Sequence, residues 1–292
     1  MNTGKLFFDK ETDMKKIGFI DYYLDEWHAN NYPEFFEKAA GEEMKVCCAW
    51  GKIDSPIGGM TNKQWSEKYN IELVETQEEL IEKSDYIIVL SPDNPEMHVE
   101  LSELALKSGK PVYIDKTFDL TIKGAKTIFK NSDDHATPCY SSSALYFSNE
   151  LAKVKKDGIT RIASMGGGKF EIYAIHQIEQ IVALMGYDAK RVMYLGNCIQ
   201  PSLLIEFTGG RFAEINHFNE QPFSMTVGYA DGSSDSFCVE SDFFGNCIKS
   251  MAEFFKTGII PVSHEQTLAV VSVIEAGLKA KEKPFEWIEI LT

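Results

Sequence analysis

Residues 85–114 read DYIIVLSPDNPEMHVELSELALKSGKPVYI, and this stretch decides the fold of the first half of the chain. The apolar run Asp85–Leu90 predicts a buried strand, and Pro95–Ser108 has the apolar spacing of a helix that ends at Gly109. The run Pro111–Ile114 predicts a second strand. A strand, a helix and a strand joined by short links form a right-handed crossover, so the two strands are expected to be parallel neighbours.

The flanking sequence extends this pattern into a doubly wound α/β domain. Lys16–Asp21 and Met44–Trp50 predict buried strands, and the helix between them is expected to have Pro33 in its first turn and Gly41 past its end. Further helices are predicted at Thr61–Tyr69, after the capping box Thr76–Glu79 and at Thr121–Asn131, with a last strand at Ala136–Tyr140. We therefore expect a Rossmann-like parallel sheet over residues 14–140, with residues 1–13 peripheral.

The second half of the chain has a different rhythm. A helix around Tyr173–Met185 is followed by short predicted strands with tight turns at Thr208–Arg211 and Ala230–Ser233. These strands are Arg191–Leu195, Leu203–Phe207, Phe212–His217, Phe223–Tyr229 and Asp235–Val239. Two helices, Asp242–Thr257 and Ser263–Ala280, close the chain, the second opened by a capping box. Residues 141–292 are thus expected to form an α+β domain with an open antiparallel sheet.

Composition narrows the classes of function. The 292 residues carry a formal net charge of −15, with 44% hydrophobic and 25% charged residues. No basic face is available for nucleic acid or an anionic membrane, and no apolar run has the length of a membrane span. The six cysteines are scattered, without zinc-ligand spacing, so we expect reduced thiols, no metal site and a cytoplasmic protein.

Three stretches carry a resemblance to a known family. Ser91–His98 with Gly109–Thr117 resembles the segment "tPn..H......al..GkhV..EKP" of the family named for glucose–fructose oxidoreductase and myo-inositol dehydrogenase (Gfo/Idh/MocA). Gly166–Gly168 leading to His176–Glu179 is similar to its "GG…D-x-G-x-H-x-x-D" helix, and Phe254–Ala276 is similar to its closing segment. The resemblance implies an oxidoreductase with NAD or NADP as cofactor and a sugar, polyol or related polyhydroxy substrate.

Within this resemblance Lys116 and His176 are the candidate catalytic residues. Lys116 follows a predicted parallel strand, where its ammonium can hydrogen-bond a substrate hydroxyl in the crevice. A neutral His176 imidazole suits accepting a proton near pH 7. The acid that the family places four residues before the histidine is Ile172 here, and Tyr173 or Glu179 is its candidate substitute. The alternatives are a surface lysine and a structural histidine.

The loop after the first strand departs from the family. Dinucleotide folds use glycines there, so that the backbone approaches the diphosphate at a helix N-terminus, but this chain has no glycine between Gly18 and Gly41. Bulky side chains and the carboxylates of Asp21, Asp25 and Glu26 oppose close approach of phosphates. We therefore expect either weak affinity for a dinucleotide or a diphosphate that is displaced outward and held by helix N-terminal amides near His28 and by Ser91. The candidate cofactor contacts are Asp21, Tyr22, Tyr23, His28, Ser91, Pro92 and His98.

Two functional hypotheses follow from different classes. The first is an NAD(P)-dependent oxidoreductase that uses Lys116 and His176, and the second is a relative without hydride transfer that acts as a small-molecule sensor or partner protein. The rebuilt loop and Ile172 favour the second. A structural subunit is a third alternative. A homodimer or homotetramer is also expected, because a broad antiparallel sheet covered by few helices leaves a face for a partner, with Phe207, Phe212, Phe218 and Phe223 as candidate contributors.

Overall fold

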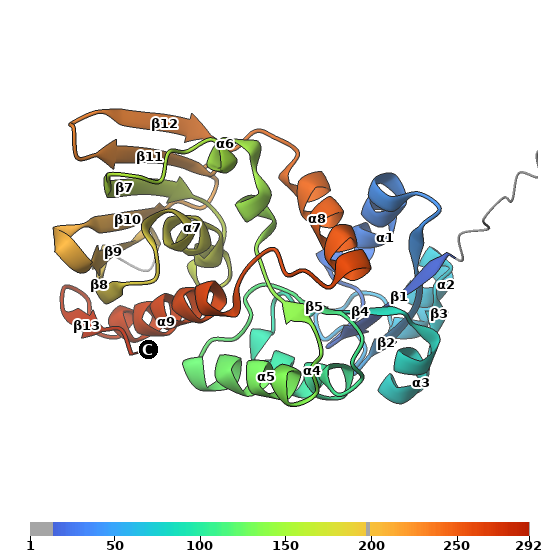
Figure 1. Ribbon diagram of the computed structural model, residues 1–292. Coiled ribbons are helices and arrows are strands. Elements are labelled where there is room, and N and C mark those ends of the chain that lie inside the picture. Colours follow the sequence, from blue (N-terminus) through green and yellow to red (C-terminus); the bar gives the residue numbers. More distant parts are fainter. Residues whose placement is uncertain (1–13, 197–198, 292) are drawn as a thin grey trace, which may run out of the picture.

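The computed structural model describes residues 14–196 and 199–291. Residues 1–13, which are predicted to be peripheral, lie outside the described residues. Figure 1 shows two halves, each built around one sheet, with the sheets lying on opposite sides of a central helical region. No helix in the described ranges combines the length and apolar character that a membrane crossing requires.

The first half contains a sheet of six parallel strands in the order β3-β2-β1-β4-β5-β6. Its strands are β1 (Lys15–Asp21), β2 (Met44–Gly51), β3 (Glu72–Leu73), β4 (Tyr86–Val89), β5 (Val112–Ile114) and β6 (Cys139–Tyr140). This order is that of a doubly wound dinucleotide-binding fold, in which strand order reverses between β1 and β4. The predicted crossover at residues 85–114 is confirmed as β4, the single-turn helix Pro95–Met97, α4 (His98–Leu106) and β5.

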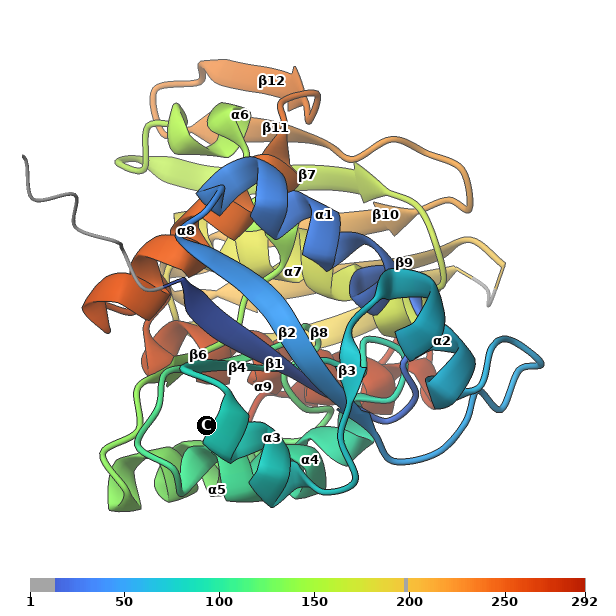
Figure 2. The ribbon, with the colours of Figure 1, turned by 90° about the vertical axis from the view of Figure 1, so that its right-hand side faces the viewer.

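Helices cover both faces of this sheet (Figure 2). On one face α1 (Trp27–Ala40) and α2 (Asn62–Tyr69) contribute Phe36 and Trp65 to a core that also contains Phe19. On the other face α3 (Gln77–Lys83), α4 and α5 (Ile122–Asp134) pack on alternate strand residues such as Ile20. Pro33 lies in the second turn of α1 and not in the first as predicted, because the helix begins at Trp27.

The second half is a seven-stranded sheet in the order β12-β11-β7-β10-β9-β8-β13. The strands are β7 (Ile159–Gly166), β8 (Ala189–Gly196), β9 (Pro201–Phe207), β10 (Phe212–His217), β11 (Ser224–Tyr229), β12 (Ser234–Cys238) and β13 (Trp287–Glu289). The predicted α+β class is confirmed, with the correction that β7 and β10 pair in parallel and make the sheet mixed. Neither β7 nor β13 was predicted.

One face of this second sheet is covered by α7 (Phe170–Met185) and α9 (His264–Lys281) (Figure 1). The opposite face carries ion pairs, with Arg161 2.5 Å from Glu214 and Arg191 2.7 Å from Glu206. Phe207 is fully buried under the helices. Phe207 is therefore not available to a partner subunit, and the homo-oligomer remains a prediction.

Helix α8 (Phe243–Thr257) returns from the second half to the core of the first. Its residues Ile248, Met251 and Phe254 are buried beside α1 and the first sheet, and the Phe254 ring lies 4.8 Å from that of Tyr140. Between the halves the chain forms the short helices Ala144–Phe147 and α6 (Asn149–Ala152). The division at residue 140, which remains a prediction, therefore separates α8 from the core in which it lies.

This packing predicts the stability of a matched pair of variants. Ile248 is fully buried in α8, whereas Ile259, just beyond the helix, is 74% exposed. Ile248→Ala is expected to lower the free energy of unfolding by about 2–5 kcal/mol, through lost burial and a residual cavity. Ile259→Ala should change it by about 0.5 kcal/mol or less. Denaturant titration of both variants tests this, and equal small losses would contradict the placement of α8.

Candidate functional site

A cleft of about 270 Å³ lies where the carboxyl ends of the first sheet face α7 and α8. Its polar lining comes from Lys116, His176, His28, Glu26 and Asp93. Aromatic side chains form much of the remaining wall, namely Trp27, Tyr173, Phe223, Phe243 and Phe244. Doubly wound sheets bind ligands at this edge, so the position agrees with the chemistry of the lining.

Lys116 follows β5 at the carboxyl edge of the sheet and is buried, with 6% of its surface exposed. Its Nζ donates to the backbone carbonyl of Pro92 at 3.3 Å. The same ammonium lies 6.0 Å from the ring centre of Tyr173. Lys116 is thus held inside the cleft, and the alternative of a solvated surface lysine does not describe it.

His176 enters the cleft from α7, on the side opposite the first sheet. Its Nδ1 lies 2.5 Å from Ser143 Oγ, and its ring centre lies 5.4 Å from that of Tyr173. Burial lowers the pKa of His176 well below its usual range, and the nearby charge of Lys116 lowers it further. The imidazole is therefore neutral near pH 7.

Glu179 lies one helical turn beyond His176, beneath the cleft. Its Oε2 accepts a hydrogen bond from the backbone N–H of Ser143 at 2.6 Å. Burial raises the pKa of Glu179 to about 8. Ser143 thus connects His176 with Glu179, a link that was not predicted. The run Ser141–Ser143, directly after the strand β6, is the sequence signal that marks this position.

The other residues near the expected acid position have separate roles. Glu171 forms an ion pair with Lys281, and this contact lowers the pKa of the Glu171 carboxyl group. Tyr173 is 41% exposed and lies between Lys116 and His176 at the cleft wall. The candidate catalytic residues Lys116, His176 and Tyr173 are therefore together in one cleft, and their catalytic roles remain predictions.

The turn between β1 and α1 is closed by a side chain of its own. Glu26 is the N-cap of α1, and its carboxylate accepts the backbone N–H of His28 at 2.7 Å and that of Ala29. His28 Nδ1 lies 3.3 Å from the same carboxylate and 3.6 Å from Asp115 Oδ2. A dinucleotide fold holds a diphosphate at the first amides of this helix. Here the amides of His28 and Ala29 are already hydrogen-bonded to the Glu26 carboxylate.

Two further buried carboxyl groups lie behind this cap. Asp21 at the end of β1 is fully buried, and Asp115 after β5 is 1% exposed. Among the described residues neither Asp21 Oδ2 nor Asp115 Oδ2 has a hydrogen-bond partner. Burial raises the pKa of Asp21 well above its usual range, and the charges of Glu26 and Asp115 add to the shift. Asp21 therefore keeps its proton to higher pH than an ordinary aspartate.

The segment after β2 is hydrogen-bonded to the turn between β1 and α1. The backbone N–H groups of Lys52 and Ile53 donate to the carbonyls of Asp21 and Tyr22. Asp25 Oδ2 accepts from Met60 N–H at 2.7 Å, and Asn62 Oδ1 accepts from Leu24 N–H at 3.1 Å. Tyr23 and Leu24 are buried by these contacts. The turn is consequently a packed part of the fold.

These observations test whether the residues at the turn suit NAD or NADP. A diphosphate at the start of α1 requires free amides and a backbone without large side chains. The amides of His28 and Ala29 are held by Glu26, and the adjacent Tyr23 and Leu24 fill the turn. As arranged here, the turn does not fit a diphosphate in the usual position.

The remaining predicted cofactor contacts lie in different places. Pro92 lines the cleft, while Ser91 is buried and donates its Oγ to the carbonyl of Asn94. His98 is fully buried, with Nδ1 3.0 Å from the carbonyl of Phe118 and Nε2 2.7 Å from that of Leu90. His98 therefore joins β4 to the segment after β5, and it is not among the residues that line the cleft; its role as a cofactor contact remains a prediction.

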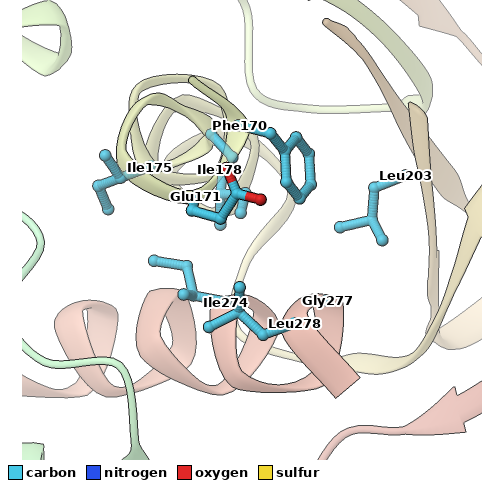
Figure 3. A pocket seen from close by; sticks show the side chains of 9 residues that line it. Phe170, Glu171, Ile175, Ile178, Leu203, Ile274, Gly277 and Leu278 are labelled. Atoms are coloured by element: carbon cyan, nitrogen blue, oxygen red, sulfur yellow. The ribbon is translucent and has the colours of Figure 1, made fainter. Parts of the chain in front are cut away.

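Other candidate sites are weaker. Figure 3 shows a cavity between α7 and α9, lined by Phe170, Ile178, Leu203 and Ile274 among others. Its volume of about 10 Å³ is no more than that of a single water site. Among residues 14–196 and 199–291 no group of His, Cys, Asp and Glu side chains has a geometry that could hold a metal ion.

Comparison with known proteins identifies the fold. No protein-family model and no curated protein matches the sequence. The scyllo-inositol dehydrogenase of Lactobacillus casei, solved with NAD(H) and scyllo-inositol, is similar in structure, with a TM-score of 0.77 and 14% identity over 96% of this chain and 100% of that chain.

Two further solved structures agree with it. A myo-inositol dehydrogenase from Corynebacterium glutamicum has a TM-score of 0.74 and 12% identity, over 96% of this chain and 99% of that one. An oxidoreductase from Bacillus cereus has a TM-score of 0.72 and 13% identity, over 96% and 99%. The structural neighbours of this chain are thus inositol dehydrogenases and related oxidoreductases, and the predicted resemblance to their family is confirmed at the level of the fold.

Proposed function

We propose that the chain is an NAD(P)-dependent oxidoreductase that acts on a CH–OH group of a small polyhydroxy compound, such as a sugar or polyol. The observation that carries the proposal is the meeting of Lys116 and His176 in one cleft at the carboxyl edge of the first sheet. The solved neighbours support the cofactor class, because they include complexes with NAD and with NADP.

The two residues have complementary abilities toward a hydroxyl group. The ammonium of Lys116 can donate a hydrogen bond to a substrate oxygen and stabilise negative charge on it. When His176 Nδ1–H donates to Ser143 Oγ, its Nε2 carries the lone pair that accepts a proton. The low pKa of His176 keeps this nitrogen available near pH 7.

The cleft wall supports a polyhydroxy ligand. Polar side chains of Glu26, Asp93 and His28 alternate with the rings of Trp27 and Phe223 around the cavity. Aromatic faces pack against the C–H faces of a cyclic polyol, while carboxylates accept hydrogen bonds from its hydroxyl groups. This combination favours a neutral or weakly charged compound over an anionic one.

A second candidate is a relative that binds such a compound without transferring hydride. The observation that favours it is the carboxylate of Glu26 on the α1 amides. A coupled assay separates the candidates. An oxidoreductase forms reduced nicotinamide when incubated with NAD or NADP and myo-inositol, scyllo-inositol or common hexoses. A binding protein shows calorimetric binding of one of these compounds and forms no reduced nicotinamide.

The proposed function predicts the effect of removing the Lys116 charge. Lys116→Met keeps most of the side-chain stem and removes the charge, so turnover should fall by about 10²–10⁴-fold, the range typical of a positioned proton donor. Lys126→Met on the exposed side of α5 is the matched control and should leave turnover unchanged. Initial rates of reduced nicotinamide formation measure both. Full activity of Lys116→Met would remove this residue from the mechanism.

The buried carboxyl group of Glu179 predicts how the stability of the protein depends on pH. In the unfolded chain Glu179 ionises near the ordinary glutamate pKa of 4.5, whereas in the folded protein its pKa is about 8. The folded state therefore binds more protons in this window, and its stability falls as pH rises, by up to about 1.4 kcal/mol per unit. Glu179→Gln should remove this part of the slope.

Glu171→Gln on the same helix is the control. Its carboxyl pKa is lowered by Lys281, so its contribution lies at more acidic pH and the slope between pH 5 and 8 should not change. Denaturant titrations at several pH values measure the slopes. Parallel curves for the wild-type protein and Glu179→Gln would show that Glu179 does not retain its proton.

A further inference from the structure

We propose that the carboxylate of Glu26 occupies the place of a dinucleotide phosphate on α1 and acts as an internal competitor for NAD(P). The inference rests on the proposed function, since it concerns how the same cleft admits its cofactor. The contact between Glu26 and the first amides of α1 is thereby regulatory. A dinucleotide phosphate can bind these amides only after the Glu26 side chain has moved away.

The contact has the geometry of anion binding. The Glu26 carboxylate accepts the N–H groups of His28 and Ala29, the amides that a helix N-terminus offers to phosphate. Its side chain is 4% exposed, so the charge is desolvated and close to the helix end. Two charge-assisted hydrogen bonds and the helix dipole stabilise it there.

Neighbouring side chains hold the Glu26 carboxylate and the start of α1 in place. The His28 ring lies between Glu26 and Asp115, and the Trp27 ring contacts Phe244 of α8 with 4.8 Å between ring centres. The start of α1 is thereby held from both sides.

Charge adds to the competition. A diphosphate at this position would approach the carboxylate of Glu26 and, beyond the His28 ring, the buried carboxyl group of Asp115, whose Oδ2 lies 3.6 Å from His28 Nδ1. Like charges in a site of low dielectric repel strongly. Displacing Glu26 removes both the occupied hydrogen bonds and the closest of these charges. Asp25 differs, because its carboxylate faces Met60 N–H and the Asn30 side chain.

Three variants separate these contributions. Glu26→Ala removes the occupant and its charge, Glu26→Gln removes the charge but keeps an oxygen that can cap the helix, and Asp25→Asn removes the same charge one residue away. Dissociation constants for NAD⁺, NADH, NADP⁺ and NADPH are measured by calorimetry and nucleotide fluorescence, with melting temperatures as the check of folding.

We expect Glu26→Ala to bind at least one nicotinamide dinucleotide about tenfold or more tightly than the wild-type protein, with Glu26→Gln between them. Asp25→Asn should stay within about twofold of wild type, because its charge is farther from the amides. If Glu26→Ala fails to fold, tighter binding by Glu26→Gln than by Asp25→Asn still supports the competition.

Other outcomes overturn the inference. Equal affinity of the wild-type protein and the Glu26 variants, with turnover retained, would reject the competition and leave the proposed function standing. An equal gain in Asp25→Asn would show a general effect of charge. If no variant binds any dinucleotide and the coupled assay is silent, the competition and the oxidoreductase function are both rejected.

Discussion

The structure depends on one constraint, the need to satisfy the first amides of α1 at an edge of the sheet that already buries two acids. Glu26 meets it by folding its carboxylate back onto His28 and Ala29. That contact sets the first residue of α1, and with it the phase of the helix. Tyr32 and Phe36 then face the first sheet, while Trp27 faces Phe244.

The cleft consequently has two unlike sides. On one side Lys116 at the edge of the first sheet lies near Tyr173 of α7, and His176 of α7 contacts Ser143, so an ammonium and a neutral imidazole line the same cavity. On the side of α1 the space is acidic and already filled by the chain. The structural neighbours share the fold that forms both sides of the cleft. Whether a dinucleotide can bind beside the substrate depends on the residues at the start of α1.

Local sequence patterns predicted most of the first half and less of the second. The crossover of residues 85–114 was predictable because its strands and helix are contiguous and have clear periodicity. β7 was missed because Thr160, Arg161 and Ser164 interrupt its apolar pattern, and its parallel pairing with β10 depends on residues far apart in sequence. Lys116 and His176 were found through the family resemblance.

The parts of the site that escaped prediction depend on backbone geometry. Three acids in the turn were evident from the sequence, but their charges alone did not distinguish Glu26 from Asp25. Glutamate is not among the common N-cap residues, so no sequence rule placed it on the amides. Because this N-cap was not recognised, the start of α1 was predicted too late, and Pro33 was assigned to its first turn. Ser143 was missed because its partners His176 and Glu179 come from a helix in the other half of the molecule.

The return of α8 to the first sheet has a consequence for how the protein is built. The chain leaves the first core after β6, completes most of the second sheet, and comes back through α8 before α9 closes the second core. A gene fragment ending near residue 140 would therefore encode a sheet with one apolar face partly bare, exposing side chains such as Phe36 and Tyr140. The two halves are topologically interlaced, because the first core is complete only when α8, which follows most of the second sheet in the sequence, packs onto it.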